Sequence, residues 1–396
     1  MAEIDELVRI LPPSYALWLV AIAGVAVLGF GLIAVLILAL TRRSGEIGHL
    51  KGALDAEIAL ASAFETDLAS LSAERDAAVA AHARMMDLAQ NIDDVWSRVP
   101  AAAPSEHALR LADSIPILCV ANLKGGVGKT TLAANLAAWF DDRGERVLLI
   151  DLDYQGSTSA MALGGEMLGR NLAEPGAMTL LQGGWPKLHR MVAARSNSEV
   201  IDCYYPVLNE ESRLLFSWLL GRLADDPRYR LAESLLGPRI QSVYDRIIID
   251  TPPRVTMGLV NALAAATHLL VPTQLNGLSV PAVQSFLATL DALRPVPMPD
   301  VRPVRIIGMQ RTWTSERLAT VEVEAMAEID RLLTARSLPP ETFMRDAILP
   351  TMSAFQRQAG RGLAYRAEPS VRPEMDRLGA RIAAFAPSFA EEPEED

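Results

Sequence analysis

Residues 115–140, IPILCVANLKGGVGKTTLAANLAAWF, decide the fold of the larger part of the chain. A short run of apolar, β-favouring residues leads into a glycine-rich loop, and an alanine- and leucine-rich stretch with helical spacing follows. Apolar runs at 147–151 (VLLID) and 246–250 (RIIID) begin further units of the same kind. Because strands that alternate with helices form parallel sheets, residues 115–390 are predicted to be an α/β domain, with a mostly parallel P-loop sheet flanked by helices.

The glycine-rich loop, residues 124–131, predicts a phosphate-binding site. Its three glycines let backbone N–H groups approach phosphate oxygens closely, and the helix that follows adds the positive end of its dipole. Lys129 can reach the β- and γ-phosphates, and the Thr130 hydroxyl can ligate Mg²⁺. The usual pattern has a glycine where this chain has Leu123, and a glycine turn without a ligand is the alternative. The predicted cofactors are ATP and Mg²⁺, and the predicted cofactor-binding residues are Gly125, Gly126, Val127, Gly128, Lys129, Thr130 and Thr131.

This loop resembles the deviant Walker A motif, KGGxGKT, of the ParA/MinD superfamily of ATPases, which are P-loop proteins of the SIMIBI class. Lys124 stands in the signature position of that motif. The next predicted strand leads into DLDYQGSTS, which resembles the second motif of the superfamily, DxDPQGNxS. Asp151 and Asp153 match its two acids, whereas Tyr154 replaces its proline and Ser157 replaces its asparagine.

A third segment, YDRIIIDTPP at 244–253, resembles the Walker B strand of the same superfamily, with Asp250 at its end. Weaker likenesses follow: one to the strand after Walker B, one to the strand that borders the adenine, and one to a late segment near the dimer face. These are residues 271–283, 306–312 and 344–358. The resemblance covers residues 115–390 and implies an ATPase fold over that range.

The resemblance also implies roles for individual residues. The implied catalytic residues are Lys124, Lys129 and Asp153, and the implied metal ligands are Thr130, Asp151 and Asp250. Lys124 would cross to the ATP of a second subunit in an ATP-dependent homodimer, and Asp153 would orient the attacking water. Asp151 has an alternative reading as an acid that caps the loop after its strand. Slow ATP hydrolysis in such a dimer would act as a switch for partitioning or positioning a partner.

A long apolar run lies near the N-terminus. No charged residue occurs between Arg9 and Arg42, and Tyr15 to Leu40 is almost continuously apolar, which is long enough to cross a bilayer. A signal peptide and a buried core helix are the alternatives. Because more basic residues follow the run than precede it, we expect a single-pass protein of the bacterial inner (cytoplasmic) membrane, with the N-terminus outside and the ATPase domain in the cytoplasm.

The remaining segments complete the predicted organisation. Residues 45–98 contain no proline and read as one long helix, either a dimeric coiled coil or a single helix packed on the next domain. The predicted order is an extracytoplasmic tail (1–14), a transmembrane helix (15–41), a helical stalk (45–98), a linker (99–114), the ATPase domain (115–390) and an acidic tail (391–396).

Two other functions remain open at this stage. The chain could be a bacterial tyrosine-autokinase-like protein or a non-hydrolysing nucleotide-binding scaffold. An unknown protein partner or activator is expected, whereas a net charge of −11 does not favour DNA as a partner. Seven arginines between residues 345 and 381 could contact DNA phosphates, or they could form a solvated face with ion pairs.

Overall fold

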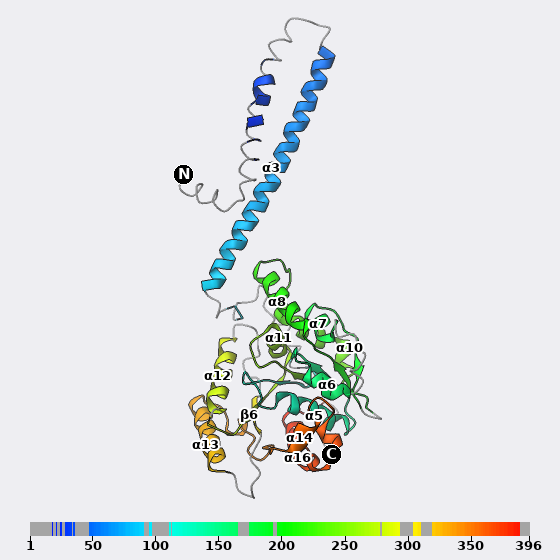
Figure 1. The fold of residues 1–396 in the computed structure, drawn as a ribbon, viewed down its shortest axis with the longest axis vertical. Coiled ribbons are helices and arrows are strands. Elements are labelled where there is room, and N and C mark those ends of the chain that lie inside the picture. The colour runs from blue at the N-terminus through cyan, green and yellow to red at the C-terminus, as the bar shows by residue number, and fades with distance from the viewer. Residues whose placement is uncertain are drawn as a thin grey trace. The chain divides into compact units, whose positions relative to one another are not determined.

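The computed structural model divides into two compact units, residues 1–84 and 85–396, and each is described by itself. Both are drawn in Figure 1. The described residues are 47–90, 95–96, 111, 113–164, 174–192, 196–277, 279–293, 304–309 and 319–388, together with single positions between 18 and 35. The predicted tails at 1–14 and 391–396 and most of the predicted linker therefore lie outside the described residues.

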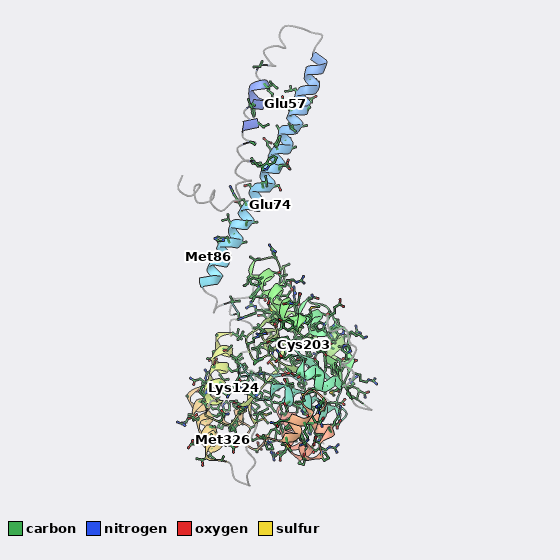
Figure 2. All side chains as sticks on the ribbon, in the orientation of Figure 1. Glu57, Glu74, Met86, Lys124, Cys203 and Met326 are labelled. Carbon is green, nitrogen blue, oxygen red and sulfur yellow. The ribbon has the colours of Figure 1, made fainter. Side chains whose placement is uncertain are left out.

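The first unit is dominated by helix α3 (Ile47–Gln90), which extends a few residues into the second unit. Its 44 residues lack proline, and apolar side chains such as Phe64, Leu68 and Leu71 are partly exposed along it. Figure 2 labels two of its acids, Glu57 and Glu74. The helix lies within the predicted stalk, and the pairing of two such helices stays a prediction.

The predicted membrane location is wrong. Within the residues that the structure describes, no helix is both long enough and apolar enough to cross a bilayer. The one helix of sufficient length, α3, carries acids and bases along its whole course, and their transfer into lipid would be costly. Most of the predicted span, Tyr15–Leu40, lies outside the described residues.

The second unit is built on a seven-stranded sheet in the order β3-β4-β2-β5-β1-β6-β7. Neighbouring strands are parallel except β3 and β4, so the prediction of a mostly parallel α/β sheet is confirmed. The strands are β1 (Ile117–Val120), β2 (Val147–Asp151), β3 (His189–Arg190), β4 (Glu199–Ile201), β5 (Arg246–Asp250), β6 (His268–Gln274) and β7 (Val304–Met309).

Helices cover both faces of this sheet, because the central strands are apolar on both sides. Leu118 and Val120 of β1 face one layer, and Ile117 and Cys119 face the other. The first layer contains α5 (Lys129–Asp141), α6 (Ser157–Leu163), α14 (Ser353–Gln358), α15 (Ala364–Ala367) and α16 (Arg372–Phe385). The second contains α7 (Gly176–Leu181), α8 (Pro206–Leu219), α9 (Arg230–Leu235), α10 (Pro238–Gln241), α11 (Met257–Ala265), α12 (Ser279–Ala292) and α13 (Thr320–Ala335). Short 3-10 turns occur at Pro227–Tyr229, Pro340–Thr342 and Pro369–Val371.

The strand order places the predicted motifs side by side. Strands β2, β5 and β1 are adjacent and parallel, so their carboxyl ends meet at one edge of the sheet. In the register, Asp151 of β2 lies opposite Asp250 of β5, and Asp250 lies opposite Val120 of β1. The glycine-rich loop leaves β1 at this edge and ends at the first residue of α5.

Candidate nucleotide site

The loop between β1 and α5 is shaped by two glycines in the left-handed conformation. Gly126 has φ 71°, and Gly128, the residue that caps the N-terminus of α5, has φ 96°. A Cβ atom on Gly128 would lie 2.7 Å from Cε of Met309, the last residue of β7. The left-handed backbone conformation therefore favours glycine at position 128, whereas the terminal methyl of Met309 could move aside for a larger residue.

Lys129 is the buried cation of the site. It is only 6% exposed, and its Nζ donates a hydrogen bond to the carbonyl oxygen of Lys124 at 3.1 Å. Burial lowers the pKa of Lys129, and the charges of Asp250 and Asp153 oppose that shift. The ammonium group thus lies within electrostatic reach of both carboxylates and is held against the loop that it is predicted to serve.

The signature lysine, Lys124, is anchored through its backbone. Its N–H donates to Oδ1 of Asn122 at 2.9 Å, and Nδ2 of the buried Asn122 donates to the carbonyl of Pro272 in β6 at 2.9 Å. Among the described residues, the side chain of Lys124 makes no hydrogen bond or ion pair, and it is partly exposed (Figure 2). The backbone of Lys124 is fixed while its ammonium group is left available.

A second amide holds the middle of the loop. Nε2 of Gln274, the last residue of β6, donates to the carbonyl of Gly126 at 3.0 Å, and Asn276 donates from its side chain to Oε1 of Gln274 at 3.1 Å. Sequence reasoning missed Asn122 and Gln274 as loop-holding residues. Their position directly at the carboxyl ends of β1 and β6 is the signal that could have identified them.

Asp250 is one of two fully buried acids of the site, with Asp151. Its Oδ2 accepts hydrogen bonds from Oγ1 of Thr130 at 2.9 Å and from Oγ1 of Thr158 at 2.6 Å. Its Oδ1 is buried and has no hydrogen-bond partner among the described residues. Burial raises the pKa of Asp250 to about 6. A buried carboxylate oxygen without a donor beside a threonine hydroxyl fits the oxygen ligands that Mg²⁺ takes together with phosphate.

Both carboxylate oxygens of Asp151 accept hydrogen bonds from residues that follow it closely in the chain. Its Oδ2 accepts from the N–H and the hydroxyl of Ser159, at 2.9 and 2.7 Å, and its Oδ1 accepts from the N–H of Asp153 at 3.0 Å. Burial, together with the charge of Asp250, raises its pKa well above the usual range. These bonds favour the loop-capping role for Asp151 over a direct bond to Mg²⁺.

Asp153 lies two residues further along the same loop and is partly buried. Its Oδ1 accepts from the N–H of Gln155 at 3.0 Å, and its carbonyl accepts from the N–H of Gly156 at 2.8 Å. The charge of Asp153 raises the pKa of Lys129 against the effect of burial, so the two groups lie within electrostatic reach of each other. The three acids and Lys129 therefore gather at one edge, as the motifs predicted.

The arginines between residues 345 and 381 have a different arrangement. Five of the seven form ion pairs: Arg345 with Asp330, Arg357 with Glu368, Arg366 with Asp141 and Asp142, Arg377 with Glu374, and Arg381 with Asp346. These pairs favour the solvated face over a DNA-binding stripe, and most of them join separate elements rather than turns of one helix.

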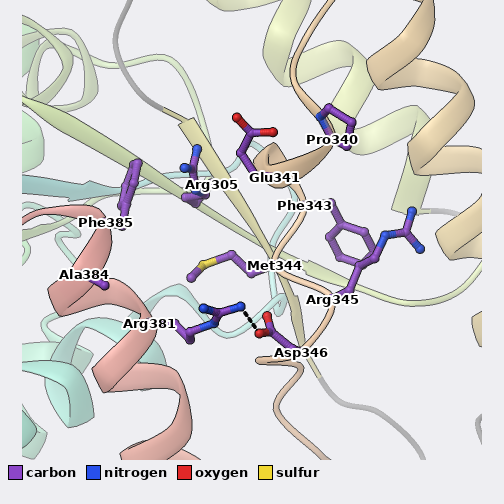
Figure 3. A pocket seen from close by; sticks show the side chains of 10 residues that line it. All are labelled: Arg305, Pro340, Glu341, Phe343, Met344, Arg345, Asp346, Arg381, Ala384 and Phe385. Carbon is purple, nitrogen blue, oxygen red and sulfur yellow. Dashed lines mark hydrogen bonds and ion pairs between the residues drawn. The ribbon is translucent and has the colours of Figure 1, made fainter.

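A cavity of about 500 Å³ lies among these arginines, beside the amino end of β7 and thus away from the carboxyl edge that carries the nucleotide loop. Figure 3 shows Arg305 and Phe385 on one side of it and the ion pair between Arg381 and Asp346 on another. The Arg305 guanidinium lies 4.2 Å over the ring of Phe385. The cavity holds none of the predicted site residues.

Loop, strands and buried acids together define a P-loop nucleotide-binding protein. The family described as "AAA domain" matches residues 115–299. The chain is 33% identical to the chromosome partitioning protein ParA of Caulobacter vibrioides over 184 residues, which are 46% of this chain and 65% of that protein. It is 36% identical to the chromosome-partitioning ATPase Soj of Thermus thermophilus over 210 residues, which are 52% of this chain and 74% of Soj.

The fold has a solved counterpart. An ATP complex of a McdA variant from Cyanothece superposes with a TM-score of 0.55 at 19% identity, over 68% of this chain and 96% of McdA. The chain belongs to the ParA/Soj family of P-loop ATPases. The predicted family is thereby confirmed, whereas the transmembrane anchor predicted with it is not supported by any helix of the described residues.

Proposed function

We propose that this chain is a Mg²⁺-dependent ATPase of the ParA/Soj type that serves as a nucleotide switch in partitioning or positioning a partner. The observation that carries the proposal is the buried Asp250, at the end of β5 and beside the loop that carries Lys129 and Thr130. One of its oxygens accepts from the hydroxyls of Thr130 and Thr158, and the other accepts no hydrogen bond from a described residue.

Binding exchanges one partner of Lys129 for another. In the loop, Nζ of Lys129 donates to the carbonyl of Lys124. An incoming phosphate oxygen carries more negative charge than that carbonyl and can replace it, while the N–H groups around Gly126 and Gly128 surround the phosphate. Mg²⁺, held by Thr130 and Asp250, would neutralise charge on the phosphate oxygens. Asn122 and Gln274 keep the loop backbone in place during this exchange.

Hydrolysis needs a water molecule aligned with the terminal phosphate. Asp153 lies in the loop between β2 and α6, residues 152–156, which we call the switch loop. Both oxygens of Asp151 accept hydrogen bonds, whereas among the described residues Asp153 accepts only at Oδ1, from the N–H of Gln155. We assign Asp153 to orient the water. Two observations support this assignment: Asp153 is partly exposed, so water can reach it, and its charge acts on Lys129, the residue proposed to bind the phosphates.

The switch is proposed to close as an ATP-dependent homodimer. The support in this chain is Lys124, whose backbone N–H is fixed by Asn122 and whose ammonium group has no partner among the described residues. A lysine held in this way can reach the nucleotide of a second copy without rearranging its own loop. A protein partner or activator would then recognise the closed form.

Two substitutions in the full chain test the proposal. Lys129→Ala removes phosphate contacts from the ground state and the transition state, so we expect loss of ATP binding and of turnover. Asp153→Ala should bind ATP as the unaltered chain does and lose at least about 100-fold in kcat, since its role is confined to the chemical step. Binding of a fluorescent ATP analogue and release of phosphate measure the two effects. Tight binding by Lys129→Ala would refute the site. Binding without turnover in the unaltered chain would instead indicate the non-hydrolysing scaffold.

A further inference from the structure

Tyr154 occupies the position at which the family motif has proline, and the structure gives its ring two partners. The guanidinium of Arg254 lies 4.6 Å from the centre of the Tyr154 ring, and the ring of Tyr205 meets it edge-on at 6.1 Å. The three residues come from three segments: the loop after β2, the segment after β5 and the residue that precedes α8. We call these three residues, Arg254, Tyr154 and Tyr205, the stack. The stack joins the switch loop to two other segments of the fold.

The end of the switch loop is already fixed by close packing. Gly156 has φ 66°, and a Cβ atom there would lie 2.6 Å from the carbonyl oxygen of Cys203 and 2.8 Å from the ring of Tyr204. One turn later, the hydroxyl of Ser159 accepts from the N–H of Cys203 at 3.0 Å. Residues 156–159 thus lie directly on the segment that leads to Tyr205. Asp153 to Gln155 are held by local hydrogen bonds to Asp151 and Gly156. The constraint that these local bonds do not supply is a contact to another segment of the fold.

Arg254 supplies that constraint from the other side. It is exposed and forms no ion pair with a described carboxylate, and its guanidinium lies on the face of Tyr154. It follows the Walker B strand by four residues, and the next turn of chain is tied down where the N–H of Gly258 donates to the buried carboxylate of Glu211 in α8 at 2.6 Å. A planar guanidinium on an aromatic face restricts the plane of the ring as well as its position.

We infer that the stack of Arg254, Tyr154 and Tyr205 positions Asp153 for the water-orienting step; the inference rests on the proposed function. Tyr154 is joined to Asp153 by one peptide bond, so a fixed ring fixes the backbone from which the Asp153 carboxylate projects. The bond from Gln155 N–H to Oδ1 then sets the direction of that carboxylate. Proline, the family residue, would restrict φ at position 154 directly. In this chain, stacking replaces that covalent restriction.

The inference separates catalysis from binding. Phosphate contacts come from residues 124–131, which the stack does not touch, so loosening the stack should leave ATP affinity intact. A catalytic carboxylate displaced by about 1 Å can lose up to about 100-fold in rate. Tyr154, Arg254 and Tyr205 are accordingly positioning residues, which act through Asp153 rather than on the nucleotide.

The test uses the full chain and measures kcat and the dissociation constant for a fluorescent ATP analogue with Mg²⁺. Tyr154→Ala should lower kcat about tenfold and change the dissociation constant less than about twofold, whereas Tyr154→Phe, which keeps the ring, should restore nearly full kcat. Arg254→Ala should lower kcat about threefold to fivefold. Tyr154→Ala already removes the contact between the Tyr154 ring and Arg254. The double variant should therefore be no slower than Tyr154→Ala alone. The matched control is Arg213→Ala, which removes an exposed arginine of α8 paired with Glu210, and it should leave kcat unchanged.

Several results would overturn the inference. Tyr154→Ala with unaltered kcat, a parallel loss of affinity and kcat, or a Tyr154→Phe variant as slow as Tyr154→Ala would each show that the stack does not position Asp153. If Tyr154→Ala does not fold, Arg254→Ala decides, because Arg254 is exposed. If Tyr154→Ala turns over ATP normally while Asp153→Ala is inactive, the inference about the stack is refuted and the proposed function stands. Equal turnover in Asp153→Ala and the unaltered chain would end the proposed function, and the inference with it.

Discussion

The carboxyl edge of the central strands and the arginine-rich amino edge differ in how their charges are partnered. At the carboxyl edge, Asp250 has a buried oxygen with no donor among the described residues, and Lys129 is held only by a carbonyl and by charges at a distance. At the amino edge the charges are more numerous, yet Arg246 pairs with Glu145 and Arg381 with Asp346. A functional site is indicated by buried charged atoms that lack a hydrogen-bond or ion-pair partner. The number of charged residues alone does not identify it.

The largest expected effect is at Asp250. Asp250→Asn removes the negative charge that the carboxylate offers to Mg²⁺, so kcat should fall at least about 100-fold. The same change removes repulsion between Asp250 and the buried Asp151, so the melting temperature without nucleotide should stay the same or rise. Phosphate release and calorimetry measure the two quantities. A drop in melting temperature with near-normal kcat would make Asp250 a structural residue and remove the contrast between the edges.

The next effect is at Arg246, and it concerns stability. Arg246 is fully buried, donates to Glu145 and to the carbonyl of Ala386, and lies 3.9 Å over the ring of Phe140. Arg246→Ala leaves Glu145 without its partner and should lower the free energy of unfolding by about 3 kcal/mol. ATP affinity of the folded variant should be unchanged.

The control for that variant is Arg381→Ala, which breaks an exposed ion pair with Asp346. It should change the free energy of unfolding by less than about 1 kcal/mol. Chemical denaturation compares the two variants directly. Equal costs would mean that burial does not distinguish the arginines of this edge, and a loss of ATP affinity in Arg246→Ala would connect the two edges.

Apart from the Arg381 control, the smallest expected effect is the pH dependence at His268, the first residue of β6. Burial, with the charges of Arg246 and Arg305, lowers its pKa from 6.5 to about 4. Between these values the unfolded chain binds a proton that the folded chain does not, so the contribution of His268 to stability falls as pH drops from 6.5 towards 4. At about pH 5 the loss should be about 2 kcal/mol relative to about pH 7.

His268→Gln should remove that part of the pH dependence and leave the remainder. Denaturation of both proteins at about pH 7 and about pH 5 gives the difference. If the two proteins lose the same stability between these values, His268 is already protonated in the folded state, and the amino edge does not repel a further positive charge.

Local patterns were sufficient for the loop and the strands that carry it. The glycine spacing and the apolar runs before Lys124, Asp151 and Asp250 predicted a parallel sheet with these residues at one edge, because parallel strands end at the same side. The bonds that hold the loop were not predictable in this way. Asn122 reaches Pro272 and Gln274 reaches Gly126 across 150 and 148 positions of sequence, and only the tertiary fold brings them together.

The structure also bears on two other interpretations, the one of the arginines and the one of the membrane location. Ion pairs on a solvated helical face were one of two alternatives for the arginines, beside DNA binding. Arg366 pairs with Asp141 and Arg345 with Asp330, which lie in separate elements. The membrane location was inferred from hydropathy and the distribution of basic residues, and the described helices do not support it. Composition records which residues are available, whereas the partner of each one is set by the fold.

The sheet also governs how copies of this chain can meet. One edge is the two-residue strand β3, which runs antiparallel to its neighbour and is too short to template another chain. At the other edge, β7 is covered by residues 343–349: Met344 donates to the carbonyl of Ile306, and Leu349 donates to that of Gly308. Strand addition is thus discouraged at both sides. Crowding many copies of this chain would therefore not by itself seed edge-to-edge aggregates through this sheet.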